Sequence, residues 1–183
     1  PNVVADVTRR VCDFYYEAND IFYRQAGDEV DAYFFGNDLG TQLDLIASPE
    51  LLDRFVMPYT RMFADQARAA GYQVMHHCCG AVSRMIPRFI DAGVNALQPL
   101  QALACGMDAD RLARDFGGRI AFVGGIDTQD LLVHASPEQI KAEVRRVKSL
   151  LGPCLVVSPS HEALLPNVPP ENVVAMAEAA AEE

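Results

Sequence analysis

Several kinds of segment are missing from this chain of 183 residues. No apolar run approaches the roughly 20 residues that a helix needs to cross a bilayer, and no signal peptide opens the chain. We therefore expect no membrane association, and we assign the protein to the cytoplasm. Internal repeats, low-complexity tracts and linkers are missing too, so the sequence predicts a single domain over residues 1–183.

Basic residues are also scarce. The chain has 15 Lys and Arg against 25 Asp and Glu, a formal net charge of -10. Binding to nucleic acid requires clustered Lys and Arg, so this balance argues against such a partner and favours a small-molecule substrate. The five cysteines are an odd number without the spacing of a disulfide framework, which is typical of reduced cytosolic thiols. Gly124-Gly125 lacks the spacing of a dinucleotide fingerprint or a phosphate loop.

What the chain does contain is a strand followed by a helix, five times, after one opening helix. Nearly continuous apolar runs alternate with amphipathic segments, which indicates an α/β fold with a parallel sheet covered by helices. The predicted strands cover residues 30–35, 72–77, 94–97, 120–123 and 155–157. The predicted helices cover residues 3–25, 48–71, 82–90, 108–116 and 136–151, with a last one from residue 169.

Three features refine the predicted helices. Pro58 should kink or split the helix that begins after Ser48, and Pro87 should bend the next helix or delay its start. Ser136 and Gln139 have the spacing of a capping box, so a helix is expected to begin there.

Polar side chains stand directly after every predicted strand. Because the carboxyl ends of parallel strands converge on one face of a barrel, we expect these side chains to surround one active site. The predicted catalytic residues are Asp38, Asp127 and His161. The predicted substrate-binding residues are Gln98, Gln101 and Glu162.

The second of these turns also carries candidate metal ligands. His77 and Cys79 share one side of an extended strand end, because the side-chain period of a strand is two. His76 and Cys78 form an equivalent pair on the other side. His161 can supply a third ligand if a barrel closes, and three ligands with an open fourth position describe a catalytic zinc site.

Each candidate also has a plainer interpretation. A histidine and a cysteine two residues apart are more often structural than metal-binding, and Asp38 occupies a position where turn-capping aspartates are common. Loop glutamines are usually solvated. Asp127 is the stronger candidate, because the paired glycines before it let the backbone approach a ligand.

Four stretches of the chain resemble the uroporphyrinogen decarboxylase superfamily. They are residues 37–42 (NDLGTQ), 77–80 (HCCG), 122–127 (FVGGID) and 159–161 (PSH) with 168–172 (VPPEN). Their order and spacing extend over nearly the whole chain. The resemblance implies an eight-stranded parallel βα-barrel of the TIM type, of which this chain supplies the C-terminal five βα units.

The resemblance also implies an enzyme from one of two chemical branches. True decarboxylases use no metal and carry a Lys-Gly-type turn where this chain has residues 77–80. Cobalamin-dependent methyltransferases, similar to methylcobalamin:coenzyme M methyltransferase, carry His-x-Cys-Gly there and a later cysteine as third zinc ligand. The chain matches the second branch at His77 and Cys79, with His161 at the third position. This match implies zinc that holds a substrate thiol as thiolate, a corrinoid as methyl donor, and a corrinoid protein as a partner.

Two alternatives stay open beside a zinc-dependent methyltransferase. One is a metal-free decarboxylase of uroporphyrinogen or another acidic substrate that uses His161 and Asp38. The other is a non-catalytic module that binds a corrinoid or a tetrapyrrole. Five strands cannot close an ordinary eight-stranded barrel, and an open sheet exposes pairing edges. We therefore expect the chain to form a homo-oligomer or to be part of a longer protein.

Overall fold

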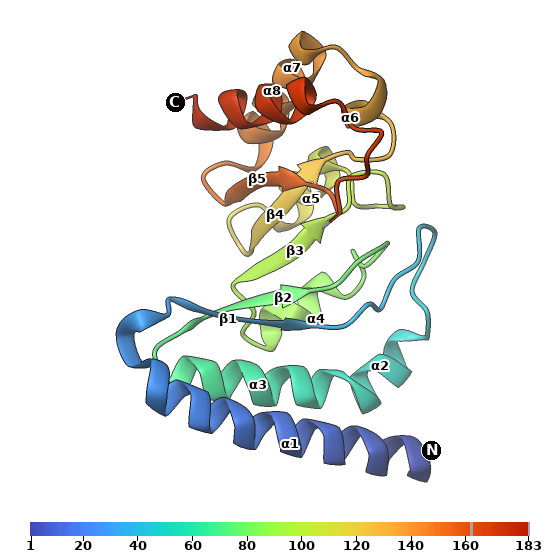
Figure 1. Cartoon of the computed structure of the whole chain (residues 1–183). Helices are drawn as coiled ribbons and strands as arrows, with labels where there is room; N and C mark the ends of the chain where they lie inside the picture. Colours follow the sequence, from blue (N-terminus) through green and yellow to red (C-terminus); the bar gives the residue numbers. More distant parts are fainter. Residues whose placement is uncertain (162, 183) are drawn as a thin grey trace. The chain divides into compact units, whose positions relative to one another are not determined.

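The computed structural model describes residues 1–161 and 163–182. It confirms the α/β fold class: five parallel strands alternate with helices in an open sheet of order β1-β2-β3-β4-β5 (Figure 1). The elements are α1 (Asn2–Ala26), η1 (Gly27–Glu29), β1 (Ala32–Gly36), α2 (Pro49–Phe55), α3 (Met57–Ala69), β2 (Gln73–His77), α4 (Ile86–Asp91), β3 (Ala96–Leu100), α5 (Ala109–Phe116), β4 (Ala121–Ile126), α6 (Leu131–His134), α7 (Pro137–Leu151), β5 (Leu155–Pro159) and α8 (Pro170–Ala181).

The chain divides into two compact units, each built from several segments. The first unit consists of Pro1–Phe35, Ala47–His76 and Arg84–Asn95. The second unit consists of Gly36–Ile46, His77–Ser83 and Ala96–Glu183. Every described residue of the predicted active site belongs to the second unit, so the geometry of that site can be described within it. The assignment of residues 1–183 to a single domain stays a prediction.

Aromatic side chains fill the core of the first unit. The Tyr23 ring packs edge-on against the rings of Tyr33 and Tyr72, with centroids 5.6 and 5.0 Å away. The hydroxyl of Tyr72 donates to the carbonyl oxygen of Gly27 at 2.7 Å, which gives its polar end a partner. In Figure 1, α1 lies beside α3, and the two helices are in contact. The aromatic core therefore ties α1 to the strands of its unit.

The prolines act as the sequence predicts. The helix expected over residues 48–71 is split into α2 and α3, and Pro58 is the second residue of α3, where its missing N–H costs no helical hydrogen bond. The following helix starts late, at Ile86, with Pro87 as its second residue. Both prolines therefore mark helix starts.

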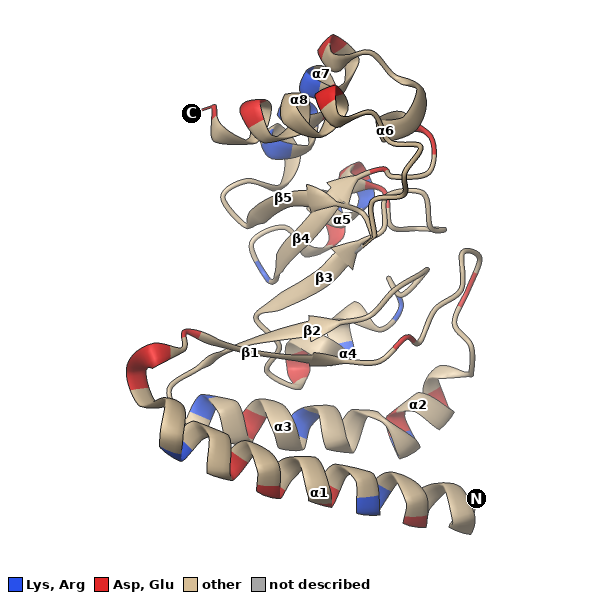
Figure 2. Ribbon diagram, viewed as in Figure 1, with Lys and Arg blue, Asp and Glu red and all other residues tan. Residues whose placement is uncertain are grey.

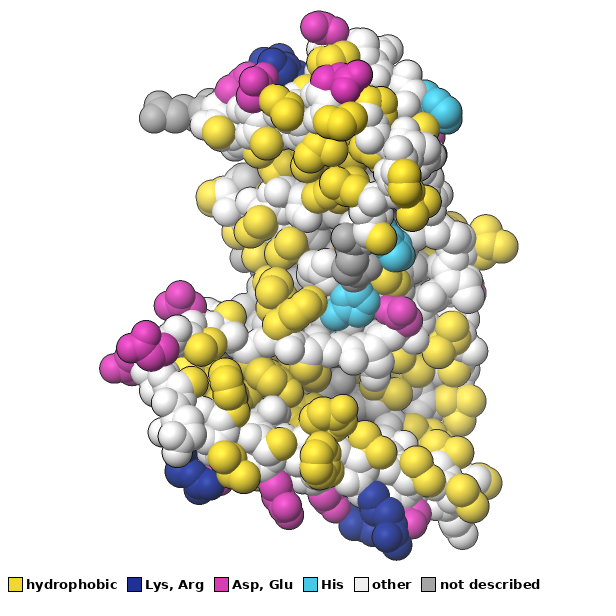
Figure 3. Space-filling view, viewed as in Figure 1, with side chains coloured by type: hydrophobic (Ala, Val, Ile, Leu, Met, Phe, Trp, Pro, Cys, Tyr) yellow, Lys and Arg dark blue, Asp and Glu magenta, His cyan; other side chains and the backbone are white. Residues whose placement is uncertain are grey.

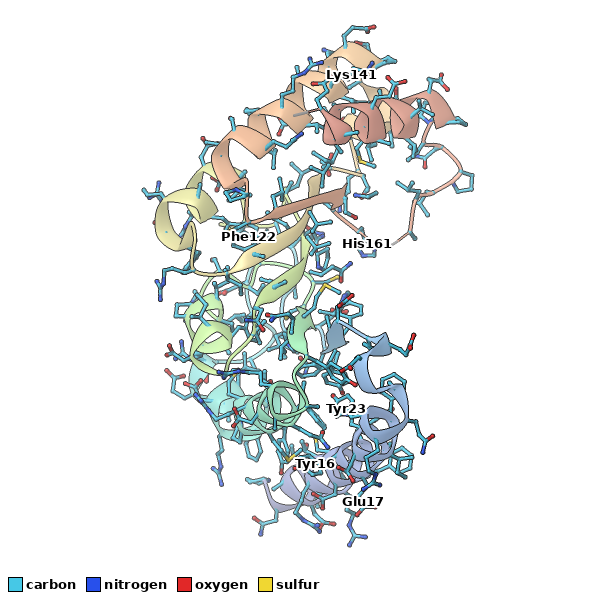
Figure 4. The ribbon with its side chains drawn as sticks, turned by 90° about the vertical axis from the view of Figure 1, so that its left-hand side faces the viewer. Tyr16, Glu17, Tyr23, Phe122, Lys141 and His161 are labelled. Atoms are coloured by element: carbon cyan, nitrogen blue, oxygen red, sulfur yellow. The ribbon has the colours of Figure 1, made fainter. Side chains whose placement is uncertain are left out.

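The second unit is a three-stranded parallel sheet covered by helices. Phe122 of β4 lies opposite Leu97 of β3 and Leu155 of β5, and its side chain is buried (Figure 4). α7 packs on β4 and β5 and lies beside α8, and it buries Ile140 and Val144. Burial of one such side chain contributes about 1.5–3 kcal/mol. None of the five strands carries Lys, Arg, Asp or Glu, and the charged residues stand on helices and loops (Figure 2).

Three details of the second unit refine the predictions. The capping box is confirmed: Ser136 Oγ accepts from the Gln139 N–H, and Gln139 Oε1 accepts from the Ser136 N–H at 2.8 Å. β3 spans Ala96–Leu100 instead of the predicted residues 94–97, and it includes Pro99, with a register shift against β4 between Leu97 and Leu100 that accommodates the missing N–H. The short helix α6 was not predicted, since it spans only four residues.

Candidate functional site

The loops that follow β1 and β2 are joined through their backbones. The Asn37 N–H donates to the His77 carbonyl at 3.0 Å, and the Ala81 N–H donates to the Thr41 carbonyl at 2.7 Å. Gly80 has a φ of +90°, and a Cβ on it would lie 2.5 Å from the carbonyl carbon of Gly40. Glycine is therefore required for the loops to approach this closely.

This close approach assembles a cluster of Asp38, His77 and Cys79. One ligand atom from each residue lies within 4.8 Å of the other two. His77 Nε2 is 3.1 Å from Asp38 Oδ1 and 3.6 Å from Cys79 Sγ. His77 and Cys79 are half-buried and Asp38 is exposed. An imidazole nitrogen, a thiol and a carboxylate thus converge on one point that solvent can reach.

Gln98 of β3 fixes the orientation of the His77 ring. Gln98 Oε1 lies 2.6 Å from His77 Nδ1. Because the amide oxygen can only accept, Nδ1 carries the proton in this pair, and Nε2 faces Asp38 and Cys79. Histidines that bind metals commonly donate their other ring N–H to such an acceptor. The sequence indicated Gln98 only as a substrate-binding residue, and that role stays a prediction.

Two further contacts hold the backbone of the second loop. The Cys79 N–H donates to Asp38 Oδ1 at 3.0 Å, and the Gly80 N–H donates to Oε1 of the buried Gln101 at 2.8 Å. Asp38 and Gln101 therefore support the turn that carries Cys79. A substrate-binding role of Gln101 stays a prediction.

The neighbouring His76 and Cys78 are packing residues. Cys78 is fully buried, and burial raises the pKa of its thiol to about 12, so the thiol stays protonated at neutral pH. Its sulfur accepts from the Leu39 N–H at 3.4 Å. In the first unit, the buried His76 ring lies 4.9 Å from the Phe35 ring and 4.7 Å from the Phe89 ring. Of the two His-x-Cys pairs, the structure therefore exposes the one formed by His77 and Cys79.

The buried Asp127 holds its own loop. Its carboxylate accepts from the backbone N–H groups of Gln129, Asp130 and Leu131 at 3.1, 2.8 and 2.9 Å. These bonds explain why α6 forms directly after β4, and they engage both carboxylate oxygens. The catalytic role predicted for Asp127 stays a prediction.

The loop after β5 carries the last two predicted residues. His161 is exposed on this loop (Figure 4), and the preceding Ser160 donates its N–H to the Ile126 carbonyl at 2.7 Å. Within the described residues, the cluster of potential metal ligands comprises Asp38, His77 and Cys79 and does not include His161. Its predicted roles as ligand and catalyst stay predictions. Glu162 lies outside the described residues.

The sequence reasoning did not place Asp38 among the metal ligands. The sequence predicted Asp38 as a catalytic residue, at the same carboxyl-end face of the sheet as His77 and Cys79. The missing signal was the backbone pairing of the two loops, which depends on the mutual fit of Gly40 and Gly80. Neither loop contains a sequence motif that predicts this pairing.

Known proteins support the sequence resemblance. The family model described as uroporphyrinogen decarboxylase (URO-D) matches residues 7–183. The uroporphyrinogen decarboxylase of Geobacter metallireducens (strain ATCC 53774 / DSM 7210 / GS-15) is 30% identical over 135 residues, which are 73% of this chain and 37% of that protein.

A solved structure shows the same fold. A methyltransferase from Methanosarcina mazei superposes with a TM-score of 0.67 at 23% identity, over 92% of this chain and 47% of that one. The five strands thus match part of a TIM-barrel-like fold. The chain spans less than half the length of either protein. In the part of the chain that the structure describes, no helix is long and apolar enough to cross a membrane.

Proposed function

We propose, on the premise that this chain belongs to the uroporphyrinogen decarboxylase family, that its candidate site binds zinc and serves a methyltransferase of the cobalamin-dependent type. Members of this family are enzymes, and the five strands of this chain match part of their TIM-barrel-like fold. The observation that carries the proposal is the convergence of Asp38, His77 and Cys79, whose ligand atoms lie within 4.8 Å of one another.

The chemistry of these three donors fits zinc. Zinc binds cysteine sulfur, histidine nitrogen and carboxylate oxygen, and catalytic zinc sites use three protein ligands with a fourth position open. The solvent-exposed side of the cluster leaves room for a fourth ligand, because Asp38 is exposed and the other two side chains are only half-buried. Bound there, zinc would keep a substrate thiol in its nucleophilic thiolate form near neutral pH.

The surrounding residues prepare this arrangement. Gln98 keeps the proton of His77 on Nδ1, which leaves the Nε2 lone pair for a metal. Asp38 accepts the Cys79 N–H and so holds the cysteine near the imidazole. The buried Cys78 keeps its proton and stays out of the donor set. A thiol substrate would reach the site from the exposed Asp38 side.

Asp38 replaces His161 as the third ligand in this proposal. The carboxylate approaches His77 Nε2 to 3.1 Å, whereas His161 is outside the cluster. A donor set of carboxylate, imidazole and thiolate carries two negative charges, which balance the charge of Zn²⁺. With His161 in place of Asp38, one positive charge would remain.

Replacement of Gln98 by leucine is expected to weaken zinc binding by about 10–100-fold, the usual effect of removing a hydrogen-bond partner of a metal-bound histidine. Gln98→Glu is the matched control, because a carboxylate still accepts from the Nδ1–H. We expect Gln98→Glu to retain an affinity within about threefold of the wild type. Zinc affinities measured by competition with a chromophoric chelator provide the comparison. Equal losses in both variants would contradict an orienting role of the amide.

An activity assay of the full-length, zinc-loaded protein tests the proposed function. The reactants are methylcobalamin and a series of small thiols. The expected products are methyl thioethers, detected by mass spectrometry, with a matching loss of the methylcobalamin absorbance. Protein stripped of metal by a chelator should be inactive and should recover when zinc is restored. If zinc-loaded protein methylates no thiol, the methyltransferase proposal is wrong.

A metal-free decarboxylase is the second candidate. The 30% identity with the Geobacter metallireducens uroporphyrinogen decarboxylase favours it. In that case the His77–Asp38 pair would act without a metal as a proton-transfer couple, since the two side chains are within hydrogen-bonding distance. Decarboxylation of uroporphyrinogen that survives complete removal of zinc would establish this candidate over the first.

A further inference from the structure

Two glutamine side chains lie against the cluster of potential metal ligands. Gln98 contacts the imidazole, because its Oε1 is 2.6 Å from His77 Nδ1. Gln101 contacts the turn that carries Cys79, since its Oε1 accepts from the N–H of the next residue, Gly80, at 2.8 Å. Each of the two side-chain amides therefore uses its oxygen at the site.

The nitrogen of each amide is left over. Among the described residues, Nε2 of Gln98 and Nε2 of Gln101 have no hydrogen-bond acceptor. The orientation of the Gln101 amide follows from its partner, because the Gly80 N–H can only donate and must face an oxygen. Gln101 is only 5% exposed. A donor without an acceptor on so buried a side chain is unfavourable and rare, so its nitrogen requires an explanation.

Support of the loop does not explain this nitrogen. The Gly80 N–H needs one acceptor, and a glutamate at position 101 would supply it equally well. An amide differs from a carboxylate in its second polar atom, which donates hydrogen bonds, and in having no charge. What glutamine adds at positions 98 and 101 is therefore a neutral NH₂ donor at two points beside the cluster.

The charges around the two amides favour a neutral ligand. The loop segments 36–46, 77–83 and 101–107 contain no Lys or Arg, whereas Asp38 stands in the first of them. On the face of the second unit shown in Figure 3, the described Lys and Arg side chains lie over α7 and α8, and none of them lies beside a histidine. With zinc bound, Asp38 and Cys79 balance the charge of the metal, and a bound thiolate adds one negative charge. A second negative charge on the ligand would find no Lys or Arg in these segments to pair with.

We propose that the Nε2 groups of Gln98 and Gln101 donate to a neutral oxygen atom of the thiol substrate, such as an amide carbonyl oxygen. The inference rests on the proposed function, because the sulfur of that substrate occupies the open position on zinc. The metal then holds one end of the substrate, and the two amides hold the other. Gln101 determines specificity in this arrangement, since its nitrogen has no other partner among the described residues.

Thiol binding to the full-length protein with cobalt(II) in place of zinc tests the inference without an activity assay. Cobalt accepts the same ligand types as zinc, and its visible absorption changes when a thiolate binds. Three thiols of similar size provide the comparison: mercaptopropionamide with a neutral oxygen, mercaptopropionate with a charged one, and isopentyl thiol with none. We expect mercaptopropionamide to bind at least about tenfold more tightly than either of the others.

Gln101→Glu separates the donor from the support of the loop. The variant keeps an oxygen for the Gly80 N–H, and at about pH 8 its second oxygen is ionised and can only accept. We expect it to bind cobalt with unchanged stoichiometry and to lose the preference for mercaptopropionamide over isopentyl thiol, a change of about tenfold in the ratio of the two dissociation constants. Gln129→Glu is the matched control, because it adds the same charge at an exposed glutamine in the loop after β4, and it should keep that ratio within about twofold.

Gln98→Glu removes the second donor and still accepts from His77 Nδ1–H, so it should lower the same ratio by about fivefold. A wild type that binds the three thiols equally, or that prefers mercaptopropionate, would overturn the inference and leave the zinc site standing. A preference that survives both glutamate variants would overturn it as well. Cobalt-loaded protein that binds none of the three thiols would overturn the proposed function and, with it, this inference.

Discussion

Cys79→Ser is expected to lower bound zinc from about one ion per chain to less than about a tenth of an ion, because the thiolate is the strongest donor of the cluster. A serine hydroxyl stays protonated near neutral pH and is a poor zinc ligand. The change removes one of three protein ligands, and we expect the affinity to fall by more than the roughly 100-fold upper range seen for residues that only orient a ligand.

Elemental analysis of protein purified without chelator provides the measurement. Cys105→Ser is the control, because Cys105 is exposed and lies outside the cluster. Asp38→Ala and His161→Ala, measured in parallel, separate the two candidate third ligands. We expect Asp38→Ala to lose zinc and His161→Ala to keep it. A wild-type protein without stoichiometric zinc would end the metal proposal, whatever the variants do.

The second large effect concerns Gly80. An alanine at this position would have to adopt a φ of +90°, and its Cβ would lie 2.5–2.7 Å from the Gly40 carbonyl group and the Thr41 carbonyl oxygen. All three nearest atoms belong to the backbone, so no side chain can move aside. We expect Gly80→Ala to lower the free energy of unfolding by about 3–5 kcal/mol and to abolish stoichiometric zinc binding, because the two loops can no longer meet.

Gly71 provides a matched control for this prediction. Its φ is +91°, but a Cβ on it would meet nothing within 4 Å. Gly71→Ala therefore carries the same backbone strain without the collision, and it should cost about 1–2 kcal/mol. Urea unfolding of both variants gives the difference that is due to contact between the loops. If the two variants lose equal stability, the loops do not depend on glycine for their approach.

Local patterns in the sequence specify most of the fold. Pro58 and Pro87 determine where helices start, because a missing N–H is tolerated only in the first turn. Ser136 and Gln139 define the start of α7 through a capping box, which is also a contact between residues close in sequence. The predicted secondary structure differs from the structure where contacts between residues distant in sequence determine an element. β3 continues through Pro99 because β4 tolerates a register shift, and α6 exists because the buried Asp127 caps it.

The candidate site divides in the same way. Alternation of side chains at a strand end predicts two equivalent His-x-Cys pairs, and the resemblance of residues 77–80 to the family's His-x-Cys-Gly turn favoured His77 and Cys79. The contribution of Asp38 could not be read from the sequence, because Asp38 lies 39 positions before His77 and only the backbone pairing of two loops brings them together. Gln98 was recognised as part of the site, but its partner was not.

The backbone pairing of these loops bears on how such a site changes during evolution. The bonds from Asn37 to His77 and from Ala81 to Thr41 use main-chain atoms only, so no side chain at position 38, 77 or 79 takes part in them. Donor atoms can then be exchanged by single substitutions while the scaffold is inherited intact. The donor atoms of the cluster and the scaffold that presents them are therefore separable, and the close approach of Gly40 and Gly80 belongs to the scaffold.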